Sequence, residues 1–96
     1  MLTISSYTFQ GPFDSVDLLQ GDSGVYAVVT DDAGSWKLLD CGECGNLKDQ
    51  LTNHERQSCW QEHAFGKIAF AAKYCDLRGR QLIACEIRQE HQLPCG

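Results

Sequence analysis

The chain has no long apolar run, few prolines and few cations. None of its 96 residues belongs to a segment approaching the roughly 20 apolar residues that a membrane span requires. Residues 1–10 also lack the basic stretch followed by an apolar stretch that marks an export signal. No repeat, low-complexity run or linker-like segment divides the chain. We therefore expect a single domain over residues 1–96, in the cytoplasm and not in a membrane.

The scarcity of cations bears on the partners. Eight lysines and arginines stand against 13 acidic residues, which gives a formal net charge of -5. This negative net charge argues against a protein that binds duplex DNA through many phosphate contacts. A local basic patch can still exist, because most cations gather in the second half of the chain. They are Lys48, Arg56, Lys67, Lys73, Arg78, Arg80 and Arg88.

The six cysteines form an even number, which would suggest disulfides in a small secreted protein. Disulfides are rare in a reducing cytoplasm, so we expect most of the thiols to behave as small buried apolar groups. Cys75 and Cys85 fit this interpretation, because they fall inside predicted strand and helix patterns.

Hydrophobic periodicity predicts alternating strands and helices. Gly11-Pro12 is expected to end the first strand, and Pro94 cannot continue the last helix. Asn46 is the expected cap of the helix that buries Leu47 and Leu51. The predicted order is an edge strand over 2–9, helical turns within 13–20, strands over 24–30 and 36–41 with a loop over 31–35 between them, a helix after 46, a loop or irregular helix over 54–63, a strand over 66–75 and a helix over 77–91.

Glu86 is an anomaly in the last helix. At about 100° per residue it lies between Leu82 and Ile83, on the face that the helix should bury. A carboxylate there needs a metal, a cation or strong donors. The alternative is a structural glutamate at the edge of the apolar face, paired with a nearby cation. The candidates for that cation are Arg80, Arg78 and Lys73.

The stretch GVYAVV, WKLLDCGE and NLKDQLTNH over residues 24–54 resembles the core of the GIY-YIG endonuclease superfamily. The resemblance covers roughly residues 24–96. It implies an α/β (α+β) fold, with a central, mainly antiparallel three-stranded sheet flanked by helices. It also implies metal-assisted hydrolysis of a nucleic-acid phosphodiester.

The family's functional positions map onto this chain with departures. Tyr26 matches the tyrosine of the first motif, and Asp40 stands at the tyrosine position of the second. Gln50 replaces the helix arginine, whereas His54 matches the histidine that follows it. Glu86 matches the metal-binding glutamate. The closing segment LPCG lacks the family's asparagine.

The departures suggest substitutes. Arg56 can supply the lost cation, and Asp40 can act with Glu86 as a second carboxylate for Mg²⁺ or Mn²⁺. The candidate catalytic residues are thus Tyr26, His54, Arg56 and Glu86, the candidate metal ligands are Glu86 and Asp40, and the candidate substrate contacts are Lys48, Gln50 and Lys73.

A zinc site is the competing chemistry. Cys41 and Cys44 form a CxxC turn, and four ligands could be completed from His54, Cys59 and His63. The spacing of the second half is looser than in a zinc ribbon or finger. A redox role for the CxxC turn is weaker, because nothing places it at the start of a helix in a thioredoxin-like βαβ unit.

Two function classes follow from the sequence. The first is a divergent GIY-YIG nuclease-like domain that binds nucleic acid and, if active, is a divalent-metal-dependent endonuclease. The second is a decayed site on the same fold that serves as a protein-interaction module. The acidic net charge, Asp40 and Gln50 favour the second class.

Overall fold

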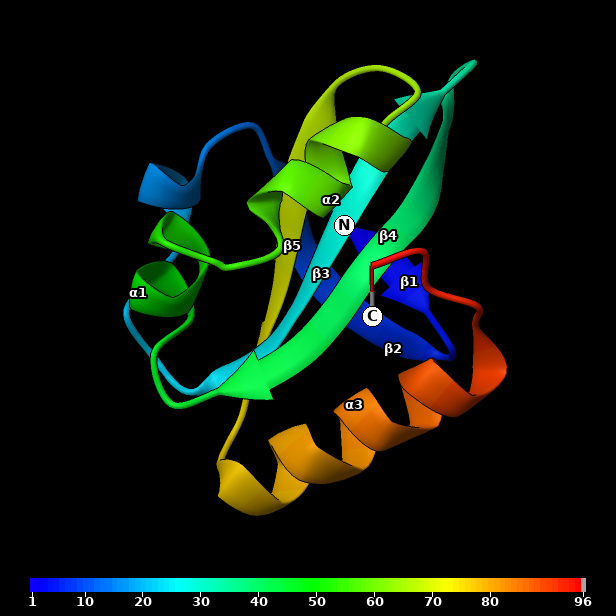
Figure 1. The fold of residues 1–96 in the computed structure, drawn as a ribbon. Helices are drawn as coiled ribbons and strands as arrows, with labels where there is room; N and C mark the ends of the chain where they lie inside the picture. Colours follow the sequence, from blue (N-terminus) through cyan, green and yellow to red (C-terminus); the bar gives the residue numbers. More distant parts are fainter. Residues whose placement is uncertain (96) are drawn as a thin grey trace.

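The fold is an antiparallel five-stranded sheet with three α-helices (Figure 1), seen in a computed structural model that describes residues 1–95. The strands lie in the order β1-β2-β5-β3-β4. No helix in this described part of the chain is long and apolar enough to cross a bilayer. The elements are β1 (Leu2–Ile4), β2 (Tyr7–Phe13), the 3-10 helix η1 (Val16–Leu18), β3 (Gly24–Asp32), β4 (Ser35–Cys44), α1 (Leu47–Thr52), α2 (Gln57–His63), β5 (Ile68–Tyr74) and α3 (Leu77–Glu90).

The α+β class and the antiparallel pairing were predicted correctly, but the sheet has five strands and not three. The difference arises from residues 2–13, which form the hairpin β1–β2 in place of one edge strand. Gly11-Pro12 was expected to end this strand, yet β2 continues through it to Phe13 and pairs with β5. The register shifts between Gln10 and Phe13. Such an irregularity tolerates proline within a strand, because the missing N–H is not needed there.

The central hairpin is longer than predicted. The expected loop over 31–35 shrinks to Ala33 and Gly34, because β3 reaches Asp32 and β4 begins at Ser35. Both turn residues have positive φ. That backbone suits a two-residue connection whose twist matches the strands. Helix α1 begins as predicted, with the Asn46 side chain accepting from the Asp49 N–H.

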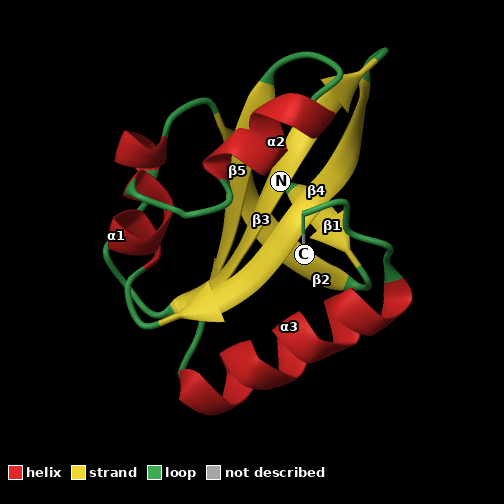
Figure 2. Ribbon diagram, in the orientation of Figure 1, coloured by secondary structure: helices red, strands yellow, loops and turns green. Residues whose placement is uncertain are grey.

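Each face of the sheet carries its own apolar layer, and each layer is covered by different helices (Figure 2). Helix α3 covers one face through Ile83, Ala84 and Ile87. Helices α1 and α2 lie on the other face, where Leu47, Leu51 and Trp60 are buried. Alternate side chains of β5 contribute to this second layer. They are Ile68, Phe70, Ala72 and Tyr74.

A bulge in β4 lets two consecutive residues face α1 and α2. Val28 pairs with Asp40 and Val29 pairs with Leu38, so Leu39 is the additional residue between them. Leu39 packs in the layer with Trp60, and the Asp40 carboxylate accepts a hydrogen bond from the Trp60 indole. Regular alternation would have sent one of these two side chains to the α3 face. The bulge therefore brings Asp40 beneath α2.

The outer edge of β4 is covered by the C-terminal part of the chain. The Cys95 N–H donates to the Leu39 carbonyl at 3.1 Å. The Arg88 Nε and Nη2 both donate to the Cys41 carbonyl, at 3.1 and 2.9 Å. These contacts occupy carbonyls of an edge strand that would otherwise be open to another chain.

A disulfide joins Cys59 of α2 to Cys95. The expectation of free thiols therefore fails for these two cysteines. The topology explains the failure, because the C-terminal segment returns along β4 to α2, with 5.9 Å between the two Cα atoms. The free cysteines are Cys41, Cys44, Cys75 and Cys85.

We expect Cys59→Ser to lower the free energy of unfolding by about 3 kcal/mol, because the bridge closes a loop with a sequence separation of 36. Urea denaturation without reductant measures the loss. Cys85→Ser, at an exposed free thiol, is the matched control and should change stability by less than about 0.5 kcal/mol. Thiol titration of the unreduced, denatured wild type should find four thiols. Finding six would contradict the bridge.

Candidate functional site

A pocket of about 620 Å³ lies beside the edge of β4, and we call it the Tyr26 pocket. The link between α1 and α2 forms one wall and α3 forms the other, with Tyr26 of β3 and residues 42 and 43 of β4 between them. Pockets of this size accommodate small molecules or single groups of a polymer. Its lining residues are Tyr26, Gly42, Glu43, Gln50, His54, Glu55, Arg56, Gln81, Ala84, Cys85, Arg88 and Gln89.

Tyr26 reaches this pocket because of the residue that faces it on β4. It pairs with Gly42, and its ring occupies the space that a side chain at position 42 would fill. A Cβ atom on residue 42 would collide with the Tyr26 hydroxyl and the adjoining ring carbons. Gly42 is therefore required for the position of the ring, whose residue is only 2% exposed.

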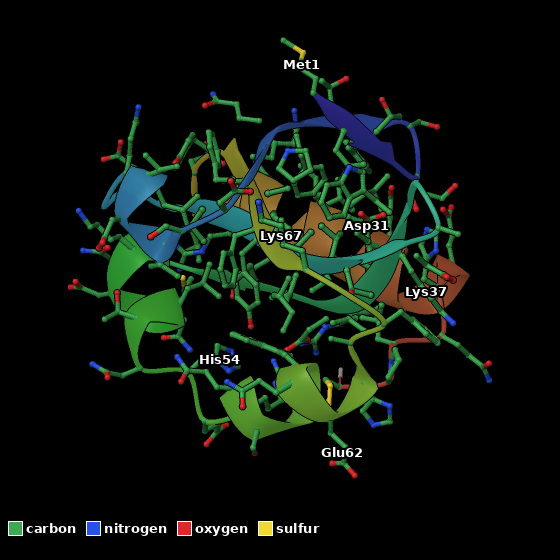
Figure 3. All side chains as sticks on the ribbon, turned by 90° about the horizontal axis from the view of Figure 1, so that it is seen from above. Met1, Asp31, Lys37, His54, Glu62 and Lys67 are labelled. Carbon is green, nitrogen blue, oxygen red and sulfur yellow. A yellow bond between two sulfur atoms is a disulfide. The ribbon has the colours of Figure 1, made fainter. Side chains whose placement is uncertain are left out.

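The Tyr26 oxygen contacts two nitrogen donors. The His54 Nε2 lies 2.8 Å from it and the Arg56 Nη2 lies 3.1 Å from it. The Arg56 backbone N–H donates to the His54 Nδ1, so a neutral His54 carries its proton on Nε2 and donates to Tyr26. Figure 3 shows His54 on the link between α1 and α2. Tyr26 accepts both bonds, which leaves its own O–H proton for an acceptor in the pocket.

Asp40 fixes the far side of this cluster. Its carboxylate is fully buried and accepts from the Cys41 N–H at 2.8 Å and from the Trp60 indole at 2.9 Å. The Arg56 Nε lies 3.0 Å from the same carboxylate, as an ion pair. Although Asp40 stands where the resemblance places a tyrosine, it orients Arg56 and α2 from below the pocket.

Burial governs the titration of the site. It raises the pKa of Tyr26 to about 12, with a further increase from the Asp40 carboxylate that the Arg56 guanidinium partly offsets. Burial also lowers the pKa of His54 below 6.5, and the nearby Arg56 lowers it further. At neutral pH the pocket therefore presents a protonated phenol and a neutral imidazole.

The charges around the pocket largely cancel. Arg56 is paired with Asp40, and Glu43 is paired with Arg80 at 2.9 Å. Arg88 retains its charge while it donates to a neutral carbonyl. The pocket is thus rich in donors without being strongly basic.

The structure brings four predicted residues together and leaves others apart. Tyr26, His54, Arg56 and Asp40 form one connected cluster, and Gln50 lines the pocket beside them. The candidate substrate contacts Lys48 and Lys73 are not among the residues that line it.

Glu86 has a different environment from the one expected at a metal site. Its carboxylate accepts a 2.5 Å hydrogen bond from the Tyr7 hydroxyl of β2 and does not line the Tyr26 pocket. Tyr7 is thus the donor that a carboxylate at this position of the helix needs. Among the ion pairs of the described residues, Glu86 has none with the expected cations Arg80, Arg78 and Lys73.

Sequence reasoning missed the α3 wall of the pocket. Its polar side chains are Gln81, Arg88 and Gln89, with the exposed Cys85 between them. Residues 81, 85, 88 and 89 recur at helical spacing and share one face. This polar stripe, on the side of α3 away from its buried residues, was the signal that the sequence offered.

The residues do not fit the expected Mg²⁺ or Mn²⁺. Both oxygens of Asp40 already accept hydrogen bonds, and Glu86 bonds Tyr7 outside the pocket. Within the described residues, the three candidate ligands that lie within 4.8 Å of one another are Cys59, His63 and Cys95, a group that could hold a metal once its disulfide is open.

The predicted CxxC pair is not part of that group. Cys41 is buried in the layer under α3, and burial raises the pKa of its thiol to about 12. Cys44 packs at the margin of the opposite layer. The two cysteines belong to opposite faces of the sheet, as neighbours three apart on a strand do.

No protein-family model, curated protein or solved structure matches this chain.

We expect Gly42→Ala to destabilise the fold by about 1–3 kcal/mol, because the added methyl collides with the Tyr26 ring and forces it from His54 and Arg56. Gly45→Ala is the matched control, since its Cβ would lie 3.7 Å from the nearest atom, an Arg80 nitrogen. Chemical denaturation measures both. Equal stabilities for the two variants would show that Tyr26 does not occupy the space beside residue 42.

Stability should fall as the pH drops below about 6.5. The pKa of His54 is lowered in the folded state, so the unfolded chain binds the proton more readily and is favoured in acid. The slope has an upper limit of about 1.4 kcal/mol per pH unit for this group. His54→Gln keeps an N–H for Tyr26 and should flatten the slope between pH 6.5 and 5. His91→Gln, at an exposed histidine, should retain it. If His54→Gln showed the same dependence of stability on pH as the wild type, the loss of stability in acid would come from a group other than His54.

Proposed function

We propose that this chain is a divergent GIY-YIG-like domain that binds nucleic acid by placing a backbone phosphate in the Tyr26 pocket. The order of elements supports the resemblance. β3, β4, α1, α2, β5 and α3 follow one another as two strands, two short helices, a strand and a helix, and β5-β3-β4 is a continuous antiparallel part of the sheet.

The observation that carries the proposal is the hydrogen bonding of Tyr26. Because its oxygen accepts from His54 and Arg56, its own proton is left for an acceptor in the pocket. A phosphate oxygen is a strong acceptor of this kind. The protonated state is secure at neutral pH, since the pKa of Tyr26 is raised to about 12.

Two arginines complete the donor set. The Arg56 side chain is 31% exposed despite its ion pair with Asp40, and Arg88 lines the opposite wall. Guanidinium groups match phosphate oxygens in geometry as well as in charge. Since the charges of the pocket largely cancel, we infer one or two phosphate contacts and not an extended basic track. The affinity should therefore depend weakly on salt, with a slope of about −1 to −2.

Binding, and not cleavage, is the function that this geometry favours. A nuclease of the expected type needs a divalent metal beside the scissile phosphate. Asp40 and Glu86 do not fit such an ion together, and no cleavage step follows from the remaining residues. The proposal therefore assigns recognition to the pocket and derives no hydrolysis from it.

The test is fluorescence anisotropy with labelled single-stranded DNA, branched DNA and RNA. Arg88→Gln, which retains a donor for the Cys41 carbonyl, should weaken binding about 10- to 100-fold, as expected for the loss of one charge-assisted hydrogen bond. Arg78→Gln is the matched control on the exposed surface of α3 and should bind as the wild type does. Tyr26→Phe should weaken binding by a similar factor, with thermal denaturation used to confirm that it is folded.

Each arm has an outcome that contradicts the proposal. Equal losses in Arg78→Gln and Arg88→Gln would indicate diffuse electrostatic attraction with no specific pocket. Absence of binding to every oligonucleotide by the folded wild type would reject recognition of nucleic acid. Metal-dependent cutting that disappears in Glu86→Ala would restore the nuclease alternative.

A protein-interaction module is the second candidate. It is favoured by exposed aromatic side chains at the other end of the central hairpin, where Trp36 is 41% and Phe65 is 63% exposed. Lys37 lies over the Phe65 ring, 4.6 Å from its centroid. A folded wild type that binds none of the oligonucleotides would favour this candidate.

A further inference from the structure

Three metal-ligand side chains meet where the C-terminal segment contacts α2. Cys59 and His63 are four residues apart, so they lie one turn apart on the same side of the helix. Cys95 reaches them because its backbone N–H is bonded to the Leu39 carbonyl at the edge of β4. The ligand atoms of the three residues all lie within 4.8 Å of one another.

We propose that Cys59, His63 and Cys95 form a zinc site that becomes available when the Cys59–Cys95 disulfide is reduced. Two thiolates and one imidazole are a donor set that Zn²⁺ prefers. Three protein ligands leave the fourth tetrahedral position to water. The site differs from the predicted zinc set, because Cys95 takes part and Cys41, Cys44 and His54 do not.

The two states exclude each other. In the oxidised state both sulfurs are bonded to one another and neither is a thiolate. A dithiol reductant breaks the S–S bond, donates two electrons and two protons, and becomes a disulfide itself. The two protein thiols then lose their protons as Zn²⁺ binds. His63 is exposed and can turn toward the metal, whereas Cys95 is already buried at the site.

Both states tie the C-terminal segment to α2, and the reduced state without metal does not. This tie matters for the Tyr26 pocket, because Trp60 is adjacent to Cys59. The Trp60 indole donates to Asp40, and its ring lies 4.8 Å from the His54 ring between centroids. Zinc should therefore restore to the reduced protein the restraint on α2 that the disulfide gives the oxidised protein.

Cobalt titration of the full chain tests the site. The protein is reduced with a phosphine, freed of reductant, and titrated with Co²⁺ and then Zn²⁺. We expect one equivalent to produce a thiolate-to-cobalt absorption band with the visible bands of tetrahedral cobalt, and Zn²⁺ to remove them. The unreduced protein should give no band. A reduced wild type without the band would overturn the proposal.

Variants identify the ligands. Cys59→Ser and Cys95→Ser should each abolish the band, whereas Cys44→Ser and Cys85→Ser should keep it. His63→Ala leaves the disulfide intact, so its folding can be verified in the oxidised state. His63→Ala should lower the affinity for Co²⁺ by at least about 10–100-fold. That is the loss seen when a group that only supports a metal ligand is removed, and a ligand itself should matter at least as much.

His91→Ala is the control for nonspecific binding by an exposed histidine. Equal losses in His91→Ala and His63→Ala would contradict the assignment of the imidazole ligand. A band that persists in both Cys59→Ser and Cys95→Ser would reject the site itself. The urea midpoint of reduced protein should also be higher with Zn²⁺ than with chelator, and no difference would contradict the proposed tie between α2 and the C-terminal segment.

Discussion

The buried carboxylate of Asp40 is the contact on which the arrangement of the pocket depends. It contacts three parts of the chain at one point, namely β4, the link between α1 and α2, and α2 itself. Its oxygens accept from the Cys41 N–H and the Trp60 indole, and Arg56 pairs with it. A buried carboxylate is unfavourable unless such partners compensate its desolvation. Their convergence fixes the side of α2 that faces the sheet and the direction in which Arg56 points.

The remainder of the site follows from two backbone features on the same strand. The bulge at Leu39 turns Asp40 toward α2, and two residues later Gly42 leaves space for the Tyr26 ring. With the ring in that space, its oxygen lies between His54 and Arg56. Asp40 thus acts as a buried structural anion, which holds Arg56 and Trp60 in place around the pocket. Because Asp40 pairs with Arg56, the charge of the cation suggested as a substitute for the missing helix arginine is partly neutralised.

The sequence predicted the helix after Asn46 and the last helix correctly, because each is set by a few residues that lie close together in the chain. The helix after Asn46 follows from its cap and from Leu47 and Leu51, and the last helix ends before Pro94 for steric reasons. The N-terminal hairpin was missed because its turn is formed by Ser5 and Ser6. Both have positive φ, a conformation that serine rarely adopts, so no turn signal is visible in the sequence there.

The site was predicted in part for a related reason. Tyr26 and His54 were selected by the resemblance and Arg56 as a substitute for the missing helix arginine, and the fold does bring the three into contact. Glu86 was selected by its helical angle, which gives the direction of a side chain without naming its neighbour. That neighbour is Tyr7, from the strand that the sequence reading did not separate. The disulfide was beyond local inference as well, since it depends on the path of the C-terminal segment along β4.

The C-terminal segment connects the pocket to the redox state of the chain. Its Cys95 makes two contacts. The backbone N–H of Cys95 covers the edge of β4 at the Leu39 carbonyl, and its sulfur is bonded to Cys59 of α2. Because Trp60 follows Cys59, any loosening of this junction acts on the same indole that holds Asp40. The pocket has no direct contact with a sulfur of the bridge, yet its donor geometry depends on a helix whose position that bridge restrains. The same segment thus covers the β4 edge of the sheet and restrains the helix that packs beside the pocket.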